Sequence, residues 1–169
     1  MNYAEQLAKA IEIATVCHAG QFDKNNKPYI LHPLRVMFKM EYMYEMAAAV
    51  LHDVVEDCPI KLVNTYGKEH MQRNDCDDAG KAVLTLLSIG FDKDIVHPVN
   101  MLSKNRIQPY SYEKYMIRVK SDQCAIKIKI ADLEDNMDFR RLPSQEVRDW
   151  NRVKKYYKFW VELKALKEY

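Results

Sequence analysis

Four ionisable side chains fall within six positions of this chain: His52, Asp53, Glu56 and Asp57. They follow the small apolar run at residues 46–51, which is typical of a helix packed in a core. Helical residues turn by about 100° each, so His52 and Asp53 can reach one ion, and a further turn would stack Glu56 and Asp57 above them. Burying so many polar groups does little for stability. The stretch predicts half of a metal site or, alternatively, a core histidine with Asp57 capping the next helix.

Another histidine, His32, stands before a proline in the sequence PYILHP at residues 28–33. Because the residue before a proline avoids the helical region, we predict an extended His32, with Pro33 opening a short helix to residue 40. A histidine at a helix entrance has the fixed direction that a metal ligand needs. A capping or surface role fits equally well, and the residues alone leave both open.

A third polar cluster lies at residues 132–136, where Asp132 and Asn136 are one helical turn apart and Asp135 is beside them. Isoleucine alternates with lysine just before it, over residues 126–130, as in a strand. Apolar residues also recur there at helical spacing, and no turn residue interrupts the run. We therefore predict a helix, whose polar face is either a solvated exterior or a second wall of the site.

The elements that position these groups are predicted to be helices. The chain has 169 residues with four glycines and six prolines, and Ala, Leu, Lys and Glu are frequent, which favours one all-α domain over residues 1–169. Helical spacing or helix-start signals occur at 3–19, 33–40, 42–55, 60–70, 81–88, 92–102, 112–119, 123–142 and 147–163. We expect about eight or nine helices in a bundle.

Charge and cysteine content exclude several classes of protein. Lysine and arginine number 26 against 24 acidic residues, without a basic block of the kind that binds nucleic acid. The four cysteines form no C-x-x-C pair, the start of the chain has no leader pattern, and no apolar run approaches membrane-spanning length. We expect a cytoplasmic protein with reduced thiols and neither nucleic acid nor membrane as partner.

Four short sequences contain the polar clusters: CHAGQ at 17–21, KPYILHP at 27–33, LHDVVED at 51–57 and KIADLEDNMD at 129–138. The order His32, His52-Asp53, Asp132 resembles the H…HD…D signature of the HD phosphohydrolase superfamily. Together the four sequences resemble the hydrolase half of the RelA/SpoT alarmone enzymes and their small stand-alone relatives, in the family's order across residues 17–142.

The resemblance implies an all-α HD-domain bundle that removes pyrophosphate from the 3′ position of (p)ppGpp or a related alarmone such as (p)ppApp. It implies one divalent ion, in that family usually Mn²⁺, and two imidazoles with two carboxylates also suit Zn²⁺, Fe²⁺ or Co²⁺. Such an ion would make a water more acidic and offset the charge that builds on phosphorus. The expected partner is therefore a small-molecule nucleotide, and the length suggests a stand-alone hydrolase without a synthetase domain.

Residue by residue, the resemblance implies that the metal ligands are His32, His52, Asp53 and Asp132. Glu56 and Asp57 match the acidic pair that activates or positions the attacking water and relays its proton. Asn136 matches an amide that holds the substrate. The other expected substrate contacts are Lys24, Tyr29, Lys104 and Arg106.

Two positions depart from the family pattern. Alarmone hydrolases typically carry an arginine, which lies over the guanine base, at the position before Lys24, but here that residue is Asp23. They often carry another arginine directly after the Asn-Met pair at residues 136–137, but here that residue is Asp138. A carboxylate cannot make a cation–π contact with a purine. A different nucleotide or a phosphate monoester therefore stays open as substrate. A non-catalytic HD regulatory module is a further alternative, although the retained ligands and acidic pair argue against it.

Overall fold

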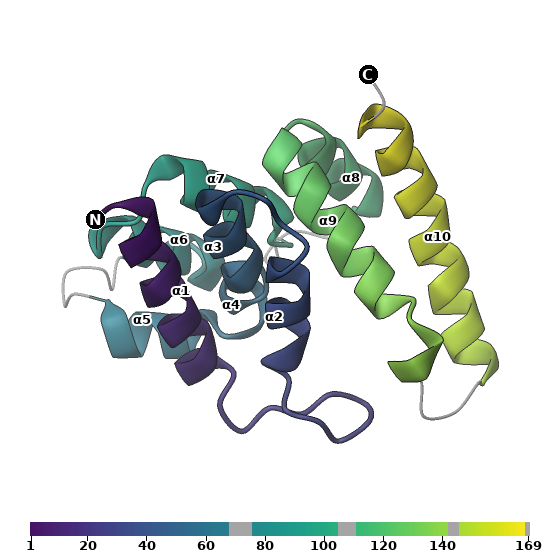
Figure 1. The fold of residues 1–169 in the computed structure, drawn as a ribbon, viewed down its shortest axis with the longest axis horizontal. Helices are drawn as coiled ribbons and strands as arrows, with labels where there is room; N and C mark the ends of the chain where they lie inside the picture. Colours follow the sequence, from purple (N-terminus) through teal and green to yellow (C-terminus); the bar gives the residue numbers. More distant parts are fainter. Residues whose placement is uncertain (68–75, 105–110, 142–145, 168–169) are drawn as a thin grey trace.

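The computed structural model describes residues 1–67, 76–104, 111–141 and 146–167, and these ranges are mainly helical (Figure 1). Their helices are α1 (Tyr3–Cys17), α2 (Leu31–Met37), α3 (Met43–Leu51), α4 (Val54–Asp57), α5 (Pro59–Tyr66), α6 (Asp78–Ser88), α7 (Lys93–Leu102), α8 (Tyr112–Lys120), α9 (Gln123–Asn136) and α10 (Val147–Lys167), with a 3₁₀ turn, η2, at Phe139–Arg141. Within the same ranges no β-strand occurs, only one antiparallel bridge between Phe22 and Pro28. The predicted all-α fold is confirmed.

Helix α3 forms the centre of the bundle. Residues 47–51 are all fully buried, and α1, α2, α7 and α9 pack around the helix. Its three consecutive alanines have side chains small enough for the neighbouring helices to approach closely. The adjacent helix α1 ends at Cys17, two residues before the predicted end, and Gly20 follows with a φ of +83°, which glycine adopts at little cost. The rigid centre of the fold thus leads directly into His52 and Asp53.

Helix α9 is buried on two sides, because α2 and α7 cover one part of it and α10 runs along another, at the end of the molecule away from α1 (Figure 1). Ile126, Ile128 and Ile130 are therefore all buried, which explains the strand-like alternation in this stretch. The predicted helix is confirmed, although it ends at Asn136, before the stop predicted at residue 142. In the described ranges, no helix combines the length and the apolar composition that crossing a membrane requires.

The predicted conformation of His32 was wrong. Helix α2 begins two residues earlier than predicted, at Leu31, so His32 is helical and its backbone amide donates to the Tyr29 carbonyl over 2.9 Å. Pro33 is then the third residue of the helix. The first amides of a helix have no partner within it, so a proline is tolerated there and the extended preference of the preceding residue is overridden.

The continuous helix predicted over residues 42–55 is interrupted between α3 and α4. The Ala49 carbonyl accepts from the His52 backbone amide over 3.5 Å and from the His52 ring Nδ1 over 2.7 Å. A ring nitrogen that occupies a carbonyl at the end of a helix competes with the regular helical ladder. The expected stacking of Glu56 and Asp57 over His52 and Asp53 on one unbroken ridge is therefore wrong.

Candidate metal centre

A cavity of about 360 Å³ lies between the α2–α4 segment and the face formed by α8, α9 and α10. It contains every predicted metal ligand, both residues of the acidic pair and three of the predicted substrate contacts. The predicted residues in its lining are Tyr29, His32, His52, Asp53, Glu56, Asp57, Lys104, Asp132 and Asn136. Side chains that are a hundred positions apart in the sequence thus share one cavity.

His52 enters the cavity from the break between α3 and α4, where its ring is 5% exposed. Its Nδ1 donates to the Ala49 carbonyl, so in the neutral ring Nε2 carries the lone pair. Nε2 lies 3.2 Å from Asp53 Oδ1 and 3.9 Å from Asp132 Oδ1. The break in the helix therefore directs Nε2 of His52 toward two carboxylates.

His32 enters from the first turn of α2 and is also buried. Its Nδ1 lies 2.6 Å from Asp135 Oδ2, and its Nε2 lies 3.1 Å from Asp132 Oδ1 and 3.5 Å from Asp53 Oδ2. Although burial alone lowers the pKa of this ring, its hydrogen bonds to Asp132 and Asp135 raise that pKa to about 9. Both imidazoles thus present Nε2 to the same pair of carboxylates.

Asp53 and Asp132 remain ionised within this cluster. Burial alone would raise the pKa of each carboxyl, but His52 beside Asp53 and Lys129 beside Asp132 hold both pKa values below their usual range. Lys129 Nζ lies 2.7 Å from Asp132 Oδ2. Two carboxylates that stay charged in a buried cavity require positive charge at its centre, either as protons on the rings or as a cation.

The donor set fits a divalent cation. One ligand atom each from His32, His52 and Asp132 lie within 4.8 Å of one another. His52 Nε2 is buried and has no hydrogen-bond partner in the part of the chain that the structure describes. Its lone pair faces an oxygen of Asp53, which is unfavourable until a proton or a cation lies between them. In both rings the second nitrogen is held by an oxygen, which is the support that metal-binding histidines usually have.

The acidic pair lies beside these ligands. Glu56 Oε1 accepts from Lys104 Nζ over 2.6 Å, and Asp57 Oδ2 lies 3.5 Å from the Tyr29 hydroxyl. The same hydroxyl donates to Asp53 Oδ2 over 2.7 Å, and burial together with Asp53 raises the pKa of Tyr29, which keeps it a donor. Tyr29 therefore links the acidic pair to a predicted ligand.

A larger cavity, of about 770 Å³, adjoins the first one and shares Glu56, Asp57 and Lys104 with it. The acidic pair thus lies at the boundary between two spaces, one with the clustered imidazoles and one without them. A substrate with two separated phosphate groups could occupy both.

The remaining predicted contacts are placed in different ways. Asn136 lines the cavity, where its Nδ2 donates to Asp132 Oδ1 over 2.5 Å. Lys24 does not line it, because its Nζ lies 3.1 Å from the buried carboxylate of Asp149 on α10. Arg106 lies outside the described residues.

The two acidic departures have partners of their own. Asp23 Oδ1 accepts the backbone amides of Asn25 and Lys27 in the turn before α2. Asp138 pairs with the exposed Arg140 next to it. Both carboxylates therefore have structural roles that the sequence comparison with the family did not suggest.

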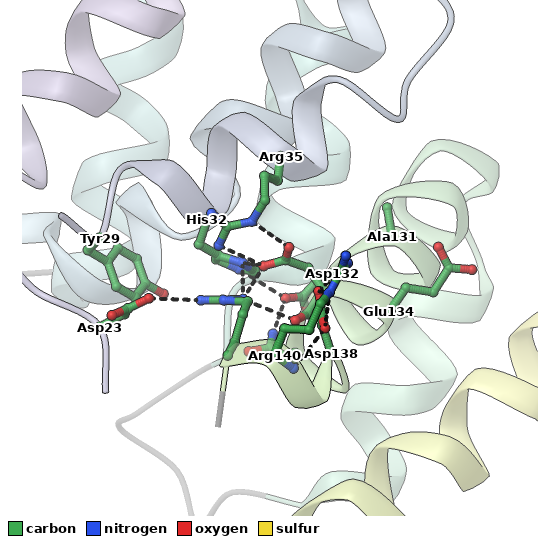
Figure 2. A network of polar contacts seen from close by, with 12 residues as sticks. Asp23, Tyr29, His32, Arg35, Ala131, Asp132, Glu134, Asp138 and Arg140 are labelled. Carbon is green, nitrogen blue, oxygen red and sulfur yellow. Dashed lines mark hydrogen bonds and ion pairs between the residues drawn. The ribbon is translucent and has the colours of Figure 1, made fainter. Parts of the chain in front are cut away.

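Sequence reasoning missed the network behind His32. Asp135 is 5% exposed, and its carboxylate contacts His32, Arg35 and Arg141. Figure 2 shows this network from close by, with Asp23, His32 and Arg35 on one side of it and Asp132 and Asp138 on the other. The available signal was the three-residue spacing of Asp132 and Asp135, which puts both on one helical face.

Comparison with known proteins gives relatives but no matching family model. A stretch of 137 residues, 79% of this chain, is 32% identical to the bifunctional (p)ppGpp synthase/hydrolase SpoT of Escherichia coli strain K12. A stretch of the same length is 29% identical to the guanosine-3′,5′-bis(diphosphate) 3′-pyrophosphohydrolase of Vibrio cholerae. A stretch of 152 residues, 85% of the chain, is 30% identical to the GTP pyrophosphokinase of Streptomyces coelicolor.

The chain spans less than a fifth of each relative, 18% of the first two and 16% of the third. These relatives are named for different reactions, so the name of a whole relative does not transfer to a shared segment. The resemblance drawn from the four short sequences is confirmed, and over about four fifths of its length this chain is a relative of the RelA/SpoT-type (p)ppGpp enzymes.

Proposed function

We propose that this chain is a metal-dependent hydrolase that removes the 3′-pyrophosphate from (p)ppGpp or a related alarmone such as (p)ppApp. The observation that carries the proposal is the shared direction of the two imidazole Nε2 atoms, which face Asp53 and Asp132 inside one cavity. Relatives named for this hydrolysis support it. The proposal includes a single functional domain over residues 1–169.

His32, His52, Asp53 and Asp132 would hold the ion, which supplies a Lewis acid for the water and for a phosphoryl oxygen. We propose Mn²⁺, as is usual in the resembling family, although the donor set also accepts Zn²⁺, Fe²⁺ and Co²⁺. Asn136 keeps Asp132 in place through its amide, and Lys129 balances the charge on the other oxygen of that carboxylate.

The proposed reaction is a substitution at the phosphorus attached to the 3′ oxygen. The oxygen of water forms a bond to that phosphorus, and the bond between phosphorus and the 3′ oxygen breaks. One proton of the water passes to Glu56 or Asp57, and the departing 3′ oxygen takes up a proton to become a hydroxyl. The products are pyrophosphate and the nucleotide with a free 3′-hydroxyl.

Lys104 is suited to bind a phosphate of the substrate. Its side chain is 38% exposed at the boundary of the two cavities, and Glu56 raises its pKa, so it stays charged. A phosphate that binds Lys104 would compete with Glu56 for it. Glu56 would then be released to accept a proton, which couples substrate binding to the base.

A second candidate keeps the metal chemistry and changes the substrate. Lys24 pairs with Asp149, and Asp23 and Asp138 have their own partners, so three positions where the family resemblance suggested phosphate or base contacts are engaged elsewhere. This favours testing other nucleotides and phosphate monoesters beside the alarmones.

The test is a panel of ppGpp, pppGpp, ppApp, other nucleotides and a phosphate monoester, each incubated with purified protein and Mn²⁺, Zn²⁺ or EDTA. We expect pyrophosphate from at least one alarmone with Mn²⁺ and none with EDTA. Release of phosphate from another compound alone would support the second candidate. Metal uptake with no turnover of any compound would support a non-catalytic nucleotide-binding module instead.

We also propose that the protein works in the cytoplasm. Its cysteines are free thiols, and two of them, Cys17 and Cys58, are buried close to the second cavity. A reducing compartment keeps such thiols from forming disulfides.

A further inference from the structure

Asp135 is a buried carboxylate behind the candidate centre. We infer that Asp135 is a positioning residue that determines which nitrogen of His32 faces the cavity, and that Arg35 and Arg141 hold Asp135 in that role. The inference rests on the proposed function in so far as His32 is a metal ligand. It concerns how the ligand is aimed, not the reaction itself.

The contacts of Asp135 use both of its oxygens. Oδ1 accepts from Arg35 Nε over 2.6 Å, and Oδ2 accepts from His32 Nδ1 over 2.6 Å and from Arg35 Nη2 over 3.2 Å. Arg141 Nη1 also donates to Oδ2, and to the Asp135 backbone carbonyl over 3.1 Å. The carboxylate therefore has a fixed orientation, set by groups from α2, α9 and η2.

This arrangement determines the protonation pattern of the His32 ring. A guanidinium only donates hydrogen bonds, so the two arginines keep Asp135 as an acceptor that has no proton to offer. His32 Nδ1 must then carry a proton. Its other nitrogen, Nε2, faces Asp132 and Asp53, where a cation that displaces any proton held there can take its lone pair.

Helix α9 therefore contacts the ring from both ends. Asp132 lies at Nε2 and Asp135 at Nδ1, and the two carboxylates are three residues apart on one face of the helix. His32 and Arg35 have the same spacing on α2. Two helices that are about a hundred residues apart in the chain are thus joined in a register that places His32.

Arg141 adds a second attachment. Its Nη2 lies 3.5 Å from Asp23 Oδ2, and its backbone carbonyl accepts from Asn25 Nδ2 over 2.6 Å. The turn before α2 is thereby tied to the same arginine that contacts Asp135. The orientation of His32 depends on side chains alone, since its Nδ1 is held by a carboxylate and not by a backbone carbonyl.

The experiment compares Asp135→Asn with wild type and with Asp138→Asn, a matched control that removes a carboxylate just beyond the same helix. Zn²⁺ is titrated into protein labelled with ¹⁵N-histidine, and affinity and the His32 nitrogen signals are read together. In wild type we expect a slowly exchanging proton on Nδ1 and metal at Nε2. The control should match wild type in both readouts.

Asparagine has one acceptor oxygen, for which two arginines compete. Its NH₂ group is then left to face His32 Nδ1, which favours the opposite tautomer with the proton on Nε2. We expect Asp135→Asn to weaken Zn²⁺ binding by about 10- to 100-fold and to lose the Nδ1 proton signal. A purely structural role predicts no change of tautomer, so an unchanged signal with unchanged affinity overturns the inference.

Arg35→Met is a second variant, which covers the case that Asp135→Asn fails to fold. The Arg35 side chain is 40% exposed, so its loss leaves less buried charge behind. We expect a smaller loss of Zn²⁺ affinity and faster exchange of the Nδ1 proton, and no change in either would overturn the inference. If the wild-type protein takes up no Zn²⁺, both the proposed metal centre and this inference fail. If the wild-type protein binds Zn²⁺ and Asp135→Asn binds it identically with the same His32 signals, only this inference fails.

Discussion

His52 at the junction of α3 and α4 and His32 at the contact of α2 with α9 present the same nitrogen to the same cavity, but their other nitrogens are held differently. His52 Nδ1 donates to the backbone carbonyl of Ala49, three residues earlier. His32 Nδ1 donates to the side chain of Asp135, 103 residues later. One anchor is local and the other depends on the tertiary structure.

The difference shows which substitutions each histidine can tolerate. A backbone carbonyl is present whatever residue occupies position 49, so the direction of His52 follows from the fold of α3 alone. The direction of His32 needs Asp135 and the arginines around it, each of which a single substitution can remove. Substitutions around the two rings can test this difference.

Replacing Asp53 removes one of the two carboxylates that both anchored rings face. Asp53 lies 3.2 Å from His52 Nε2 and 3.5 Å from His32 Nε2, and its side chain makes no capping hydrogen bond to α4. We expect Asp53→Ala to fold, to lose metal during purification and to lose turnover by about 10³-fold or more, since the ion supplies several kcal/mol at the transition state. Metal analysis and initial rates measure this.

Asp94→Ala is the control for that substitution. Asp94 is an exposed aspartate that accepts from the Tyr3 hydroxyl and does not line the cavity. It should retain metal and turnover. An Asp53→Ala protein with full activity would remove Asp53 from the centre and leave Asp132 as the carboxylate that the two histidines share.

Replacing Glu56 should leave both histidine anchors intact and affect only the proton transfer. Glu56 contacts Lys104 and neither imidazole in the contacts of the described residues. We expect Glu56→Gln to keep metal affinity and to lower kcat by about 10²- to 10⁴-fold, the usual contribution of a general base. Zinc titration and steady-state kinetics separate the two effects.

An opposite result is informative here too. If Glu56→Gln lost its metal, Glu56 would belong to the ligand set. If it kept normal kcat, the proton would pass to Asp57 alone, which Asp57→Asn would then show.

The sequence was sufficient for the fold class and for the residues that share the cavity. Apolar spacing predicted α1 and α9, and the glycine at position 20 follows the end of α1. The helices follow from residue type and local spacing. The grouping of His32, His52, Asp53 and Asp132 came from the family resemblance of the four short sequences, because local spacing left the role of each histidine open.

Other features depend on contacts that local spacing does not encode. The break after Leu51 arises because the His52 ring donates a hydrogen bond to the Ala49 carbonyl, and no proline or glycine in the sequence predicts the break. Lys24 is close in sequence to the KPYILHP motif, but it pairs with the buried carboxylate of Asp149 on α10 and so does not line the cavity. Asp135 contacts His32 and Arg35 on α2, and these contacts follow only from the packing of two helices that are far apart in the sequence.

The smallest expected effect tests the local anchor directly. Ala49 is fully buried in α3, and Ala49→Gly removes its methyl group while keeping the carbonyl that holds His52. We expect the free energy of unfolding of the metal-free protein to fall by about 1 kcal/mol, because glycine costs about that much within a helix. Zn²⁺ affinity should stay at the wild-type value, because the acceptor is unchanged. Urea unfolding and zinc titration measure the two quantities.

A loss of affinity as large as that expected for Asp135→Asn would mean that packing around Ala49, and not its carbonyl, orients His52. The contrast between the two histidines would then disappear.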